Sequence, residues 1–296
     1  MGALVAALVG APAVAVPAAV AASPSSQCLV RNGLTRYTSL ATAITAAGTN
    51  ATLNISGTCA GTFTVTRSMT LQRLGPVGVL TPGGGNGQGT GTVLTGEEAR
   101  VVVKGLTITG GQRGVYNENG NLTLFLCTVT DNSGGLGGGV YNVDGNLNLV
   151  GTSVADNSSV GGYGAGIDNY EGTVTLSQNS SVYGNDAGIG GGVENHEGTL
   201  TLNDGSSIGD NSAEVGGGVD NFEGSVTLNG HSSISGNEAI LGGGIFNEYA
   251  TVTMTGTSSI SYNSAELGGG IYNAGGSLYG ATAGVNVFDN SPNDID

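Results

Sequence analysis

Acidic side chains recur at a regular spacing in the second half of the chain, and carboxyl groups are the residues best suited here to carry chemistry. They fall into two rows of three: Asp168, Glu194 and Asp220, and Glu171, Glu197 and Glu223. Carboxylates that folding brings together can bind Ca²⁺, so all six are candidate calcium ligands. A pair about 5–5.5 Å apart can also cleave a glycosidic bond, which makes Asp168, Glu194 and Asp220 the candidate catalytic residues of a polysaccharide-degrading enzyme.

These acids belong to an internal repeat of about 26 residues. Gly-Gly-Gly-Val or Gly-Gly-Gly-Ile recurs through it, with the variant Gly-Ala-Gly-Ile at Gly164. Each unit holds three short pieces in which apolar and polar residues alternate, and none of them is long enough for a helix. The pattern predicts an all-β parallel β-helix, a solenoid in which successive coils pair along their strands.

Two asparagines recur in every unit. The first series is Asn117, Asn142, Asn169, Asn195, Asn221, Asn247 and Asn273, and the second is Asn132, Asn157, Asn185, Asn211, Asn237, Asn263 and Asn290. Asparagines stacked coil on coil can bond amide to amide. We therefore expect two structural ladders along the solenoid axis, with no part in any chemistry.

The N-terminal part differs from the repeats. An uncharged run rich in Ala and Val ends in small residues at Ala21 and Ala22, which predicts a secretory signal peptide over residues 1–22. Residues 23–50 are expected to form a cap with a short helix over 38–48, and residues 51–296 the β-helix, with regular repeats over 111–290. In an exported chain we expect a Cys28–Cys59 disulfide, with Cys127 left over.

Charge is distributed unevenly. The chain has 7 Lys and Arg against 22 Asp and Glu, a net charge of −15, and every basic residue precedes position 114. Such a surface repels phosphate backbones and anionic membranes, so nucleic acid is excluded as a partner. No second apolar run is long enough to span a bilayer once the signal peptide is cleaved.

The motifs resemble two groups of proteins. Gly-Gly-Gly-[Val/Ile]-x-Asn alternating with [Val/Ile]-x-x-Asn resembles the repeats of polymorphic outer membrane proteins. The segment around Gly57-Thr58-Cys59-Ala60-Gly61 and Gly105-Leu106-Thr107-Ile108-Thr109 resembles the entry region of secreted pectin-lyase-like proteins. The resemblance covers about residues 27–290 and implies a right-handed parallel β-helix. It does not choose an activity, because these groups mix lyases, hydrolases and adhesins.

Alternation places three rows of side chains on the outer surface, and we expect all of them to face solvent. They are Tyr141, Asp168, Glu194, Asp220, Phe246 and Tyr272; Val143, Tyr170, His196, Phe222 and Glu248; and Asp144, Glu171, Glu197, Glu223 and Tyr249. Carboxylates among aromatic rings suit a carbohydrate surface.

We therefore expect a secreted, non-catalytic binding or adhesion module for glycans or cell-surface proteins, with no cofactor other than Ca²⁺. Two alternatives stay open. One is the polysaccharide-degrading enzyme, either a glycoside hydrolase or a lyase. The other is ice binding by columns of Thr-x-Thr pairs, at Thr173/Thr175, Thr199/Thr201, Ser225/Thr227 and Thr251/Thr253.

Overall fold

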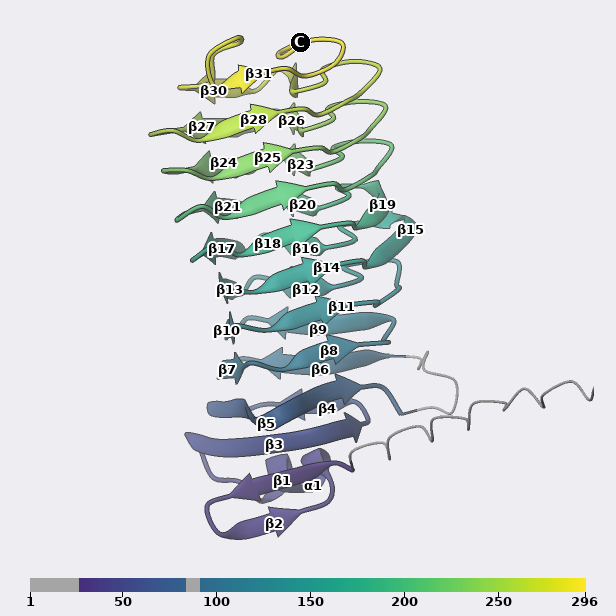
Figure 1. Cartoon of the computed structure of the whole chain (residues 1–296), viewed down its shortest axis with the longest axis vertical. Coiled ribbons are helices and arrows are strands. Elements are labelled where there is room, and N and C mark those ends of the chain that lie inside the picture. The colour runs from purple at the N-terminus through teal and green to yellow at the C-terminus, as the bar shows by residue number, and fades with distance from the viewer. Residues whose placement is uncertain (1–26, 84–90) are drawn as a thin grey trace, which may run out of the picture.

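The computed structural model describes residues 27–83 and 91–296, so the predicted signal peptide lies outside the described residues. Figure 1 shows coils stacked into one column, from the N-terminal strands at its base to the last coil at the C-terminus. The structure confirms the predicted all-β parallel solenoid with about 26 residues per turn and a single short helix in its described part.

Two large parallel sheets form the walls of the column. In the part of the chain described here, one has nine strands: β4 (Phe63–Val65), β6 (Thr92–Glu97), β9 (Arg113–Glu118), β12 (Val140–Val143), β16 (Ile167–Tyr170), β20 (Val193–His196), β23 (Val219–Phe222), β26 (Ile245–Glu248) and β29 (Ile271–Ala274). We call it the acid sheet, because Asp168, Glu194 and Asp220 lie on it.

The other large sheet consists mostly of two adjoining columns of strands. One column is β7 (Arg100–Lys104), β10 (Asn121–Phe125), β13 (Asn146–Val150), β17 (Thr173–Ser177), β21 (Thr199–Leu202), β24 (Ser225–Leu228), β27 (Thr251–Met254) and β30 (Ser277–Tyr279). The second is β8 (Thr107–Thr109), β11 (Thr128–Thr130), β14 (Ser153–Ala155), β18 (Ser181–Tyr183), β22 (Ser207–Gly209), β25 (Ser233–Ser235), β28 (Ser259–Ser261) and β31 (Val287–Phe288). The long strands β3 (Ala51–Ala60) and β5 (Met69–Thr81) begin both columns, and β1 (Leu29–Asn32) and β2 (Thr35–Tyr37) pair antiparallel before them. A short pair, β15 (Ser158–Tyr163) and β19 (Asp186–Ile189), stands apart.

Each regular coil contributes three strands, as the alternation predicts. In the coil formed by β20, β21 and β22, the side chains of Val193, Leu200, Leu202 and Ile208 are fully buried inside the column. The same positions of the next coil pair with them in register, for example Leu200 with Val226. The core is therefore a continuous stack of aliphatic side chains from one coil to the next.

Both asparagine ladders exist, and both lie inside the column. Asn195 Nδ2 donates to Asn221 Oδ1 at 2.8 Å, and Asn221 Nδ2 donates to Asn247 Oδ1 at 2.8 Å. In the second ladder, Asn211 Nδ2 donates to Asn237 Oδ1 at 3.0 Å. Each amide also bonds to a backbone carbonyl, as Asn195 does to the Gly198 carbonyl at 3.1 Å and Asn211 to the Val182 carbonyl at 3.1 Å. The ladders therefore supply hydrogen bonds at the buried bends, where the strand pairing is interrupted.

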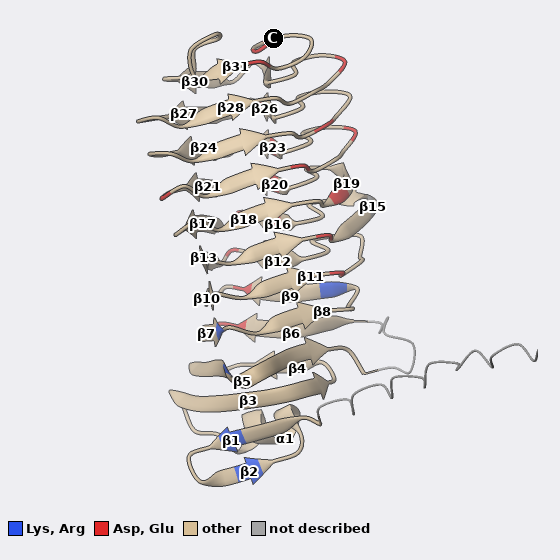
Figure 2. Ribbon diagram, in the orientation of Figure 1, with Lys and Arg blue, Asp and Glu red and all other residues tan. Residues whose placement is uncertain are grey.

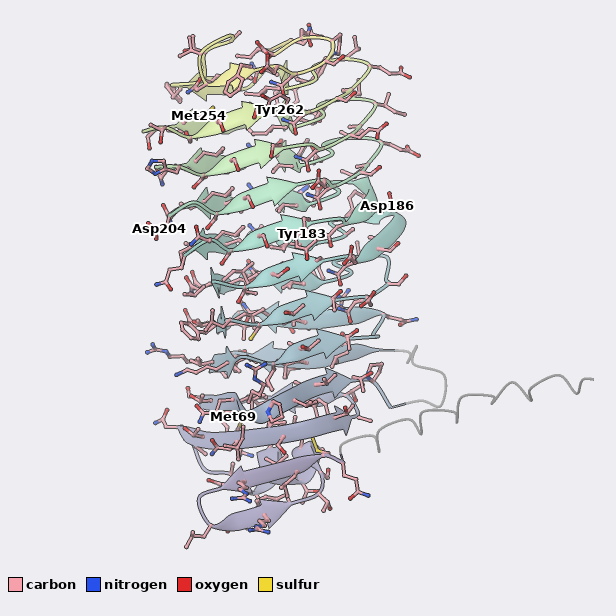
Figure 3. All side chains as sticks on the ribbon, in the orientation of Figure 1. Met69, Tyr183, Asp186, Asp204, Met254 and Tyr262 are labelled. Atoms are coloured by element: carbon pink, nitrogen blue, oxygen red, sulfur yellow. A yellow bond between two sulfur atoms is a disulfide. The ribbon has the colours of Figure 1, made fainter. Side chains whose placement is uncertain are left out.

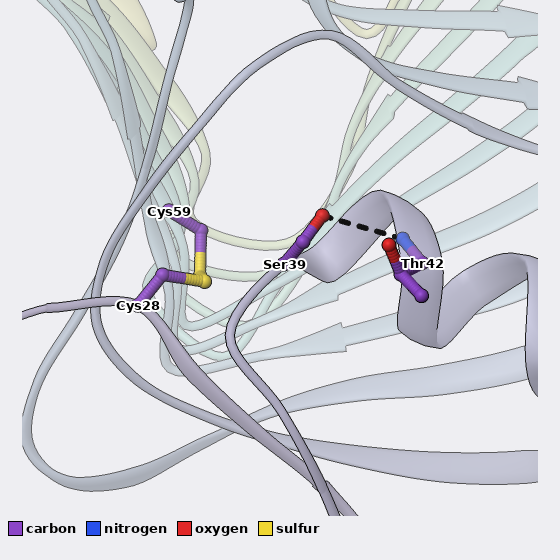
Figure 4. Close-up of a disulfide and its surroundings, with 4 residues drawn as sticks. All are labelled: Cys28, Ser39, Thr42 and Cys59. Carbon is purple, nitrogen blue, oxygen red and sulfur yellow. Dashed lines mark hydrogen bonds between the residues drawn. A yellow bond between two sulfur atoms is a disulfide. The ribbon is translucent and has the colours of Figure 1, made fainter.

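The N-terminal end is covered by the predicted cap. Helix α1 (Leu40–Ala46) lies at the base of the column against β1, β3 and β4. The Ser39 side chain accepts a hydrogen bond from the Thr42 backbone N–H at 3.4 Å, and the helix ends before Gly48. Figure 4 shows this cap beside the predicted Cys28–Cys59 disulfide, whose Cα atoms are 4.6 Å apart. The bridge ties the first described residues to β3.

Charge follows the coils as the sequence indicates. Lys and Arg lie in the N-terminal coils, whereas Asp and Glu lie along the later turns (Figure 2). Within the described ranges, the one helix is too short to cross a membrane.

Replacing Asn221 by Leu should destabilise the fold, because Asn195 loses its acceptor and Asn247 its donor inside the column. We expect the free energy of unfolding in urea to fall by about 1–3 kcal/mol. Asn229→Ala is the control: this half-buried residue bonds Asn203 at 2.9 Å in an outer turn, so its loss should cost less than about 1 kcal/mol. Equal unfolding midpoints for Asn221→Leu and the parent would contradict a stabilising ladder.

Candidate functional site

The three candidate catalytic acids are buried, which corrects the expectation that their row faces solvent. Asp168, Glu194 and Asp220 are 4%, 4% and 7% exposed. They do project from the outer face of the acid sheet, but the glycine-rich turn before each strand folds back over them. Gly190 has a φ of +63°, and a Cβ there would lie 2.8 Å from the Glu194 Cα. The first glycine of each repeat therefore packs its backbone against the acid row.

Strand register aligns the acids from coil to coil. Asp168 pairs with Glu194, and Glu194 pairs with Asp220. Since adjacent parallel strands lie about 4.8 Å apart, the three carboxyl groups form one file along the column axis.

Apolar residues form a column on one side of this file. They directly precede the glycine-rich motifs and are paired or bridged in order along the axis: Leu136, Tyr163, Ile189, Val215, Leu241 and Leu267. Leu136 and Tyr163 are 41% and 45% exposed. We call this set the apolar column.

Stacked rings lie on the other side. Tyr170 stacks on His196 with ring centroids 5.1 Å apart, and His196 stacks on Phe222 at 4.9 Å. These rings belong to the second of the three rows predicted from the sequence. That row faces outward as expected, and its side chains are half-buried or exposed. Its rings support one another along the axis.

A pocket of about 300 Å³ opens between the two sides. Its lining is Leu136 and Tyr163 from the apolar column, Tyr141, Asp168 and Glu194 from the floor, and Tyr170 and His196 from the stacked rings. Asp220 does not line it. We call this space the acid pocket. Two of the three candidate catalytic residues thus reach a cavity, whereas Asp220 lies one coil beyond Glu194 along the axis.

Burial changes the protonation of these carboxyl groups. It raises the pKa of Asp168 to about 7, although the positive charge of Arg113 acts in the opposite direction. Burial, together with the neighbouring Asp220, raises the pKa of Glu194 far above its ordinary range. Burial also raises the pKa of Asp220, to about 6, and this rise is smaller because the Asp220 carboxylate accepts a hydrogen bond from Glu194. Glu194 is therefore the protonated member of the pair at neutral pH.

The third predicted row does not join the other acids. Glu171, Glu197 and Glu223 have φ values of 53°, 51° and 51° and are exposed in the turns that follow the strands. Other acids, such as Asp204 and Asp186, lie at opposite edges of the column (Figure 3). Over residues 27–83 and 91–296, no three His, Cys, Asp or Glu side chains gather so as to hold a metal ion. The six predicted calcium ligands therefore do not form one site.

Arg113 is a site residue that the sequence analysis missed. Its guanidinium lies 4.7 Å from the Tyr141 ring centroid and 5.4 Å from that of Tyr116, and its Nε donates to the Leu136 carbonyl at 3.0 Å. It thus fixes the first residue of the apolar column beside the acid pocket. Its place as the last basic residue before the acid rows was the available signal.

The remaining candidates lie elsewhere. The Thr-x-Thr pairs are in register on β17, β21, β24 and β27, in the sheet that lacks the acid row. The second of the two histidines in the sequence, His231, is exposed in a turn and does not line the pocket. Cys127 is buried, and this burial raises the pKa of its thiol to about 11, so it is not a reactive thiolate.

Comparison with protein-family models, with curated protein sequences and with solved structures finds no match to this chain.

The raised pKa values predict that stability falls as pH rises. A carboxyl group whose pKa is higher in the folded protein than in the unfolded chain stabilises the fold while it is protonated. This contribution is complete below the pKa of the unfolded chain, and it is lost as the pH rises through the pKa of the folded protein. For Asp168 this loss of stability takes place between pH 3.8 and about pH 7, which are the ordinary and the raised pKa of the group. We expect the free energy of unfolding in urea to fall by about 2–4 kcal/mol between about pH 4.5 and about pH 8.

Glu194→Gln should remove part of that fall and raise stability at the upper end of the range, because the amide needs no buried charge. Glu223→Gln deletes an exposed carboxylate and controls for general repulsion in an acidic chain. If both variants kept the slope of the parent, the buried file would not be its source.

Proposed function

We propose that the chain is a secreted, non-catalytic binding module whose acid pocket holds one unit of a glycan. The observation that carries this proposal is a small concave pocket with aromatic walls and two carboxyl groups on its floor. Its volume of about 300 Å³ lies at the lower limit of ligand pockets and matches a ligand of about one ring. A small cavity favours a glycan over a protein partner, which buries a broad face.

The chemistry of the lining supports a sugar. Sugar rings combine apolar C–H surface with hydroxyl groups, and they pack against side chains that have an apolar body and a polar tip. Tyr141, Tyr163 and Tyr170 are such side chains. Carboxyl groups at Asp168 and Glu194 can accept or donate hydrogen bonds according to their protonation.

Export is supported by two observations. The Cys28–Cys59 disulfide suits an oxidising compartment, and the apolar run before residue 23 has the composition of a signal peptide. The resemblance of the Gly-Gly-Gly-[Val/Ile]-x-Asn repeats to those of polymorphic outer membrane proteins agrees with a role at a cell surface.

Tyr170→Ala should weaken glycan binding, because it removes one wall of the pocket and one ring of the stack with His196. In titration calorimetry of the full chain against short oligosaccharides, we expect a loss of about tenfold in affinity, which is about 1.4 kcal/mol. Tyr183→Ala is the matched control, since Tyr183 is 43% exposed on β18, compared with 38% for Tyr170. Equal losses in the two variants, or no binding by the parent, would refute the proposal.

A second function is favoured by one specific observation: Glu194 is a buried, protonated carboxyl group in the pocket beside the more acidic Asp168. A carboxylic acid with a raised pKa next to a carboxylate is the pair that a glycoside hydrolase uses as acid and nucleophile. The two residues occupy adjacent coils in register. The short distance between two carboxyl groups on adjacent coils fits a glycosidase that retains the configuration of the sugar.

Reducing-end release from a polysaccharide panel separates the two functions. A hydrolase should lose at least about a thousandfold in rate in Glu194→Gln and in Asp168→Asn, because each removes a reacting group. The exposed Glu223→Gln variant should keep the parental rate. The binding module predicts that neither the parent nor any variant releases reducing ends.

A further inference from the structure

A second cavity, of about 220 Å³, lies beside the acid pocket and has a different lining. It is lined by Gly134, Gly135 and Leu136 from one turn, and by Gln112 and Arg113 among residues of the coils before that turn. None of the described residues that line it is acidic. We call this cavity the turn pocket. Leu136 lines both cavities, so the two are neighbours on the surface.

The turn pocket lies where the coils first become longer. The turn that leads from the second asparagine ladder to the acid sheet spans residues 112–113 before β9, and residues 133–138 before β12. In later coils the long turns pair with one another. There the N–H groups of Glu214 and Val215 donate to the Gly188 carbonyl of the coil before, at 2.9 and 3.3 Å. The first long turn has no long turn before it to accept such bonds.

Two backbone N–H groups are left open for this reason. Gly135 and Leu136 occupy the positions of Glu214 and Val215 in the first long turn, and neither N–H group donates to another described residue. Both residues are exposed, and a Cβ added at Gly135 would meet no atom within 4 Å. Because the matching N–H groups of later coils point towards the coil before, these two point into the turn pocket. Successive N–H groups of a turn form a concavity that binds anions.

Arg113 brings a positive charge to the same pocket. Its Nε donates to the Leu136 carbonyl at 3.0 Å, and its guanidinium lies over the Tyr141 ring. It forms no ion pair with a carboxyl group of the described residues. Burial lowers the pKa of Arg113, because its guanidinium is poorly solvated, but the group stays charged at neutral pH. A poorly solvated cation without a counter-ion favours an anionic ligand.

The charge of the surrounding coils also suits an anion. All seven Lys and Arg precede position 114, whereas Glu97 and Glu98 are the only acids that do. Figure 2 accordingly shows the basic residues in the lower part of the column. Through Arg113, the turn pocket belongs to this basic part of the chain.

We propose that the turn pocket is an oxyanion site, in which the N–H groups of Gly135 and Leu136 and the guanidinium of Arg113 bind one sulfate or phosphate group. Proteins bind such groups with these two kinds of donor. Because Leu136 also lines the acid pocket, two sources satisfy the geometry. One is a free inorganic anion, and the other is a sulfate ester on a sugar whose ring lies in the acid pocket. The oxyanion site itself does not depend on the glycan function.

The test is a titration of the isotope-labelled full chain with sodium sulfate, followed by its backbone amide signals in nuclear magnetic resonance. We expect the signals of Gly135 and Leu136 to shift and to saturate, whereas sodium chloride of equal ionic strength leaves them in place. The titration is run at about pH 6, where Asp168, whose pKa burial raises to about 7, is mostly protonated and does not repel the anion.

An internal control and a matched variant accompany the titration. The signals of Glu214 and Val215 should not move, because their N–H groups already have an acceptor. Arg113→Gln should weaken sulfate binding at least about tenfold, because it removes the charge of the site. Arg100→Gln removes the same charge from an exposed residue of β7 and should keep the parental affinity. The titration of the parent decides the proposal even if Arg113→Gln fails to fold.

Two results would overturn the proposal. In the first, the signals of Gly135 and Leu136 stay in place, or they move equally in chloride. In the second, Arg113→Gln and Arg100→Gln lose affinity equally, because such a loss reflects general charge attraction.

A sulfate ester of glucose, compared with glucose and with inorganic sulfate, identifies the source of the oxyanion. If the ester binds tighter than both, the glycan carries the oxyanion, and the proposal and the glycan function both stand. If inorganic sulfate binds and the ester binds no tighter, the site holds a free anion, so the proposal stands and the glycan function fails for this sugar. If glucose binds and sulfate does not, the glycan function stands and the proposal fails.

Discussion

Register between coils is the constraint on which the rest of this structure depends. Because every coil repeats after about 26 residues, each side chain meets the same position of the coils before and after it. For the asparagines this is favourable, since each amide can donate to the next and accept from the one before. For carboxyl groups it is unfavourable, because like charges are stacked about 4.8 Å apart. Stacking in register therefore produces the asparagine ladders, which stabilise the column. It also produces the acid file, which does not stabilise the column.

The acid file shows how the fold concentrates chemistry at one place. A file of acids that is exposed to water, such as the turn residues Glu197 and Glu223, costs little free energy because water screens the repulsion between the carboxylates. Asp168, Glu194 and Asp220 differ because the glycine-rich turns fold back over them. Burial then favours their protonated forms, and two of them, Asp168 and Glu194, lie beside a cavity. Carboxyl groups with raised pKa values in a cavity are typical of binding and catalytic sites.

Much of the fold could be predicted from local patterns, and the burial of the site could not. Alternation placed Leu200 and Leu202 inside, and the spacing of Asn195 and Asn221 indicated a ladder. Alternation also placed Glu194 on the outer face, but it cannot say whether another segment covers that face. The cover comes from turns with positive φ, whose path depends on tertiary packing. One signal was available: an apolar residue directly precedes each glycine-rich motif, as Tyr163 precedes Gly164, and these residues form the apolar column.

The central claim is that Asp168 and Glu194 are carboxyl groups held protonated by burial beside an open pocket. The most direct test is a pH titration of the side-chain carboxyl carbons by nuclear magnetic resonance, with Asp168→Asn and Glu194→Gln to assign the two signals. The account predicts that Asp168 titrates near 7 and that Glu194 titrates above it. If both carboxyl groups titrate below about pH 5, the acid file is solvated and the account is wrong.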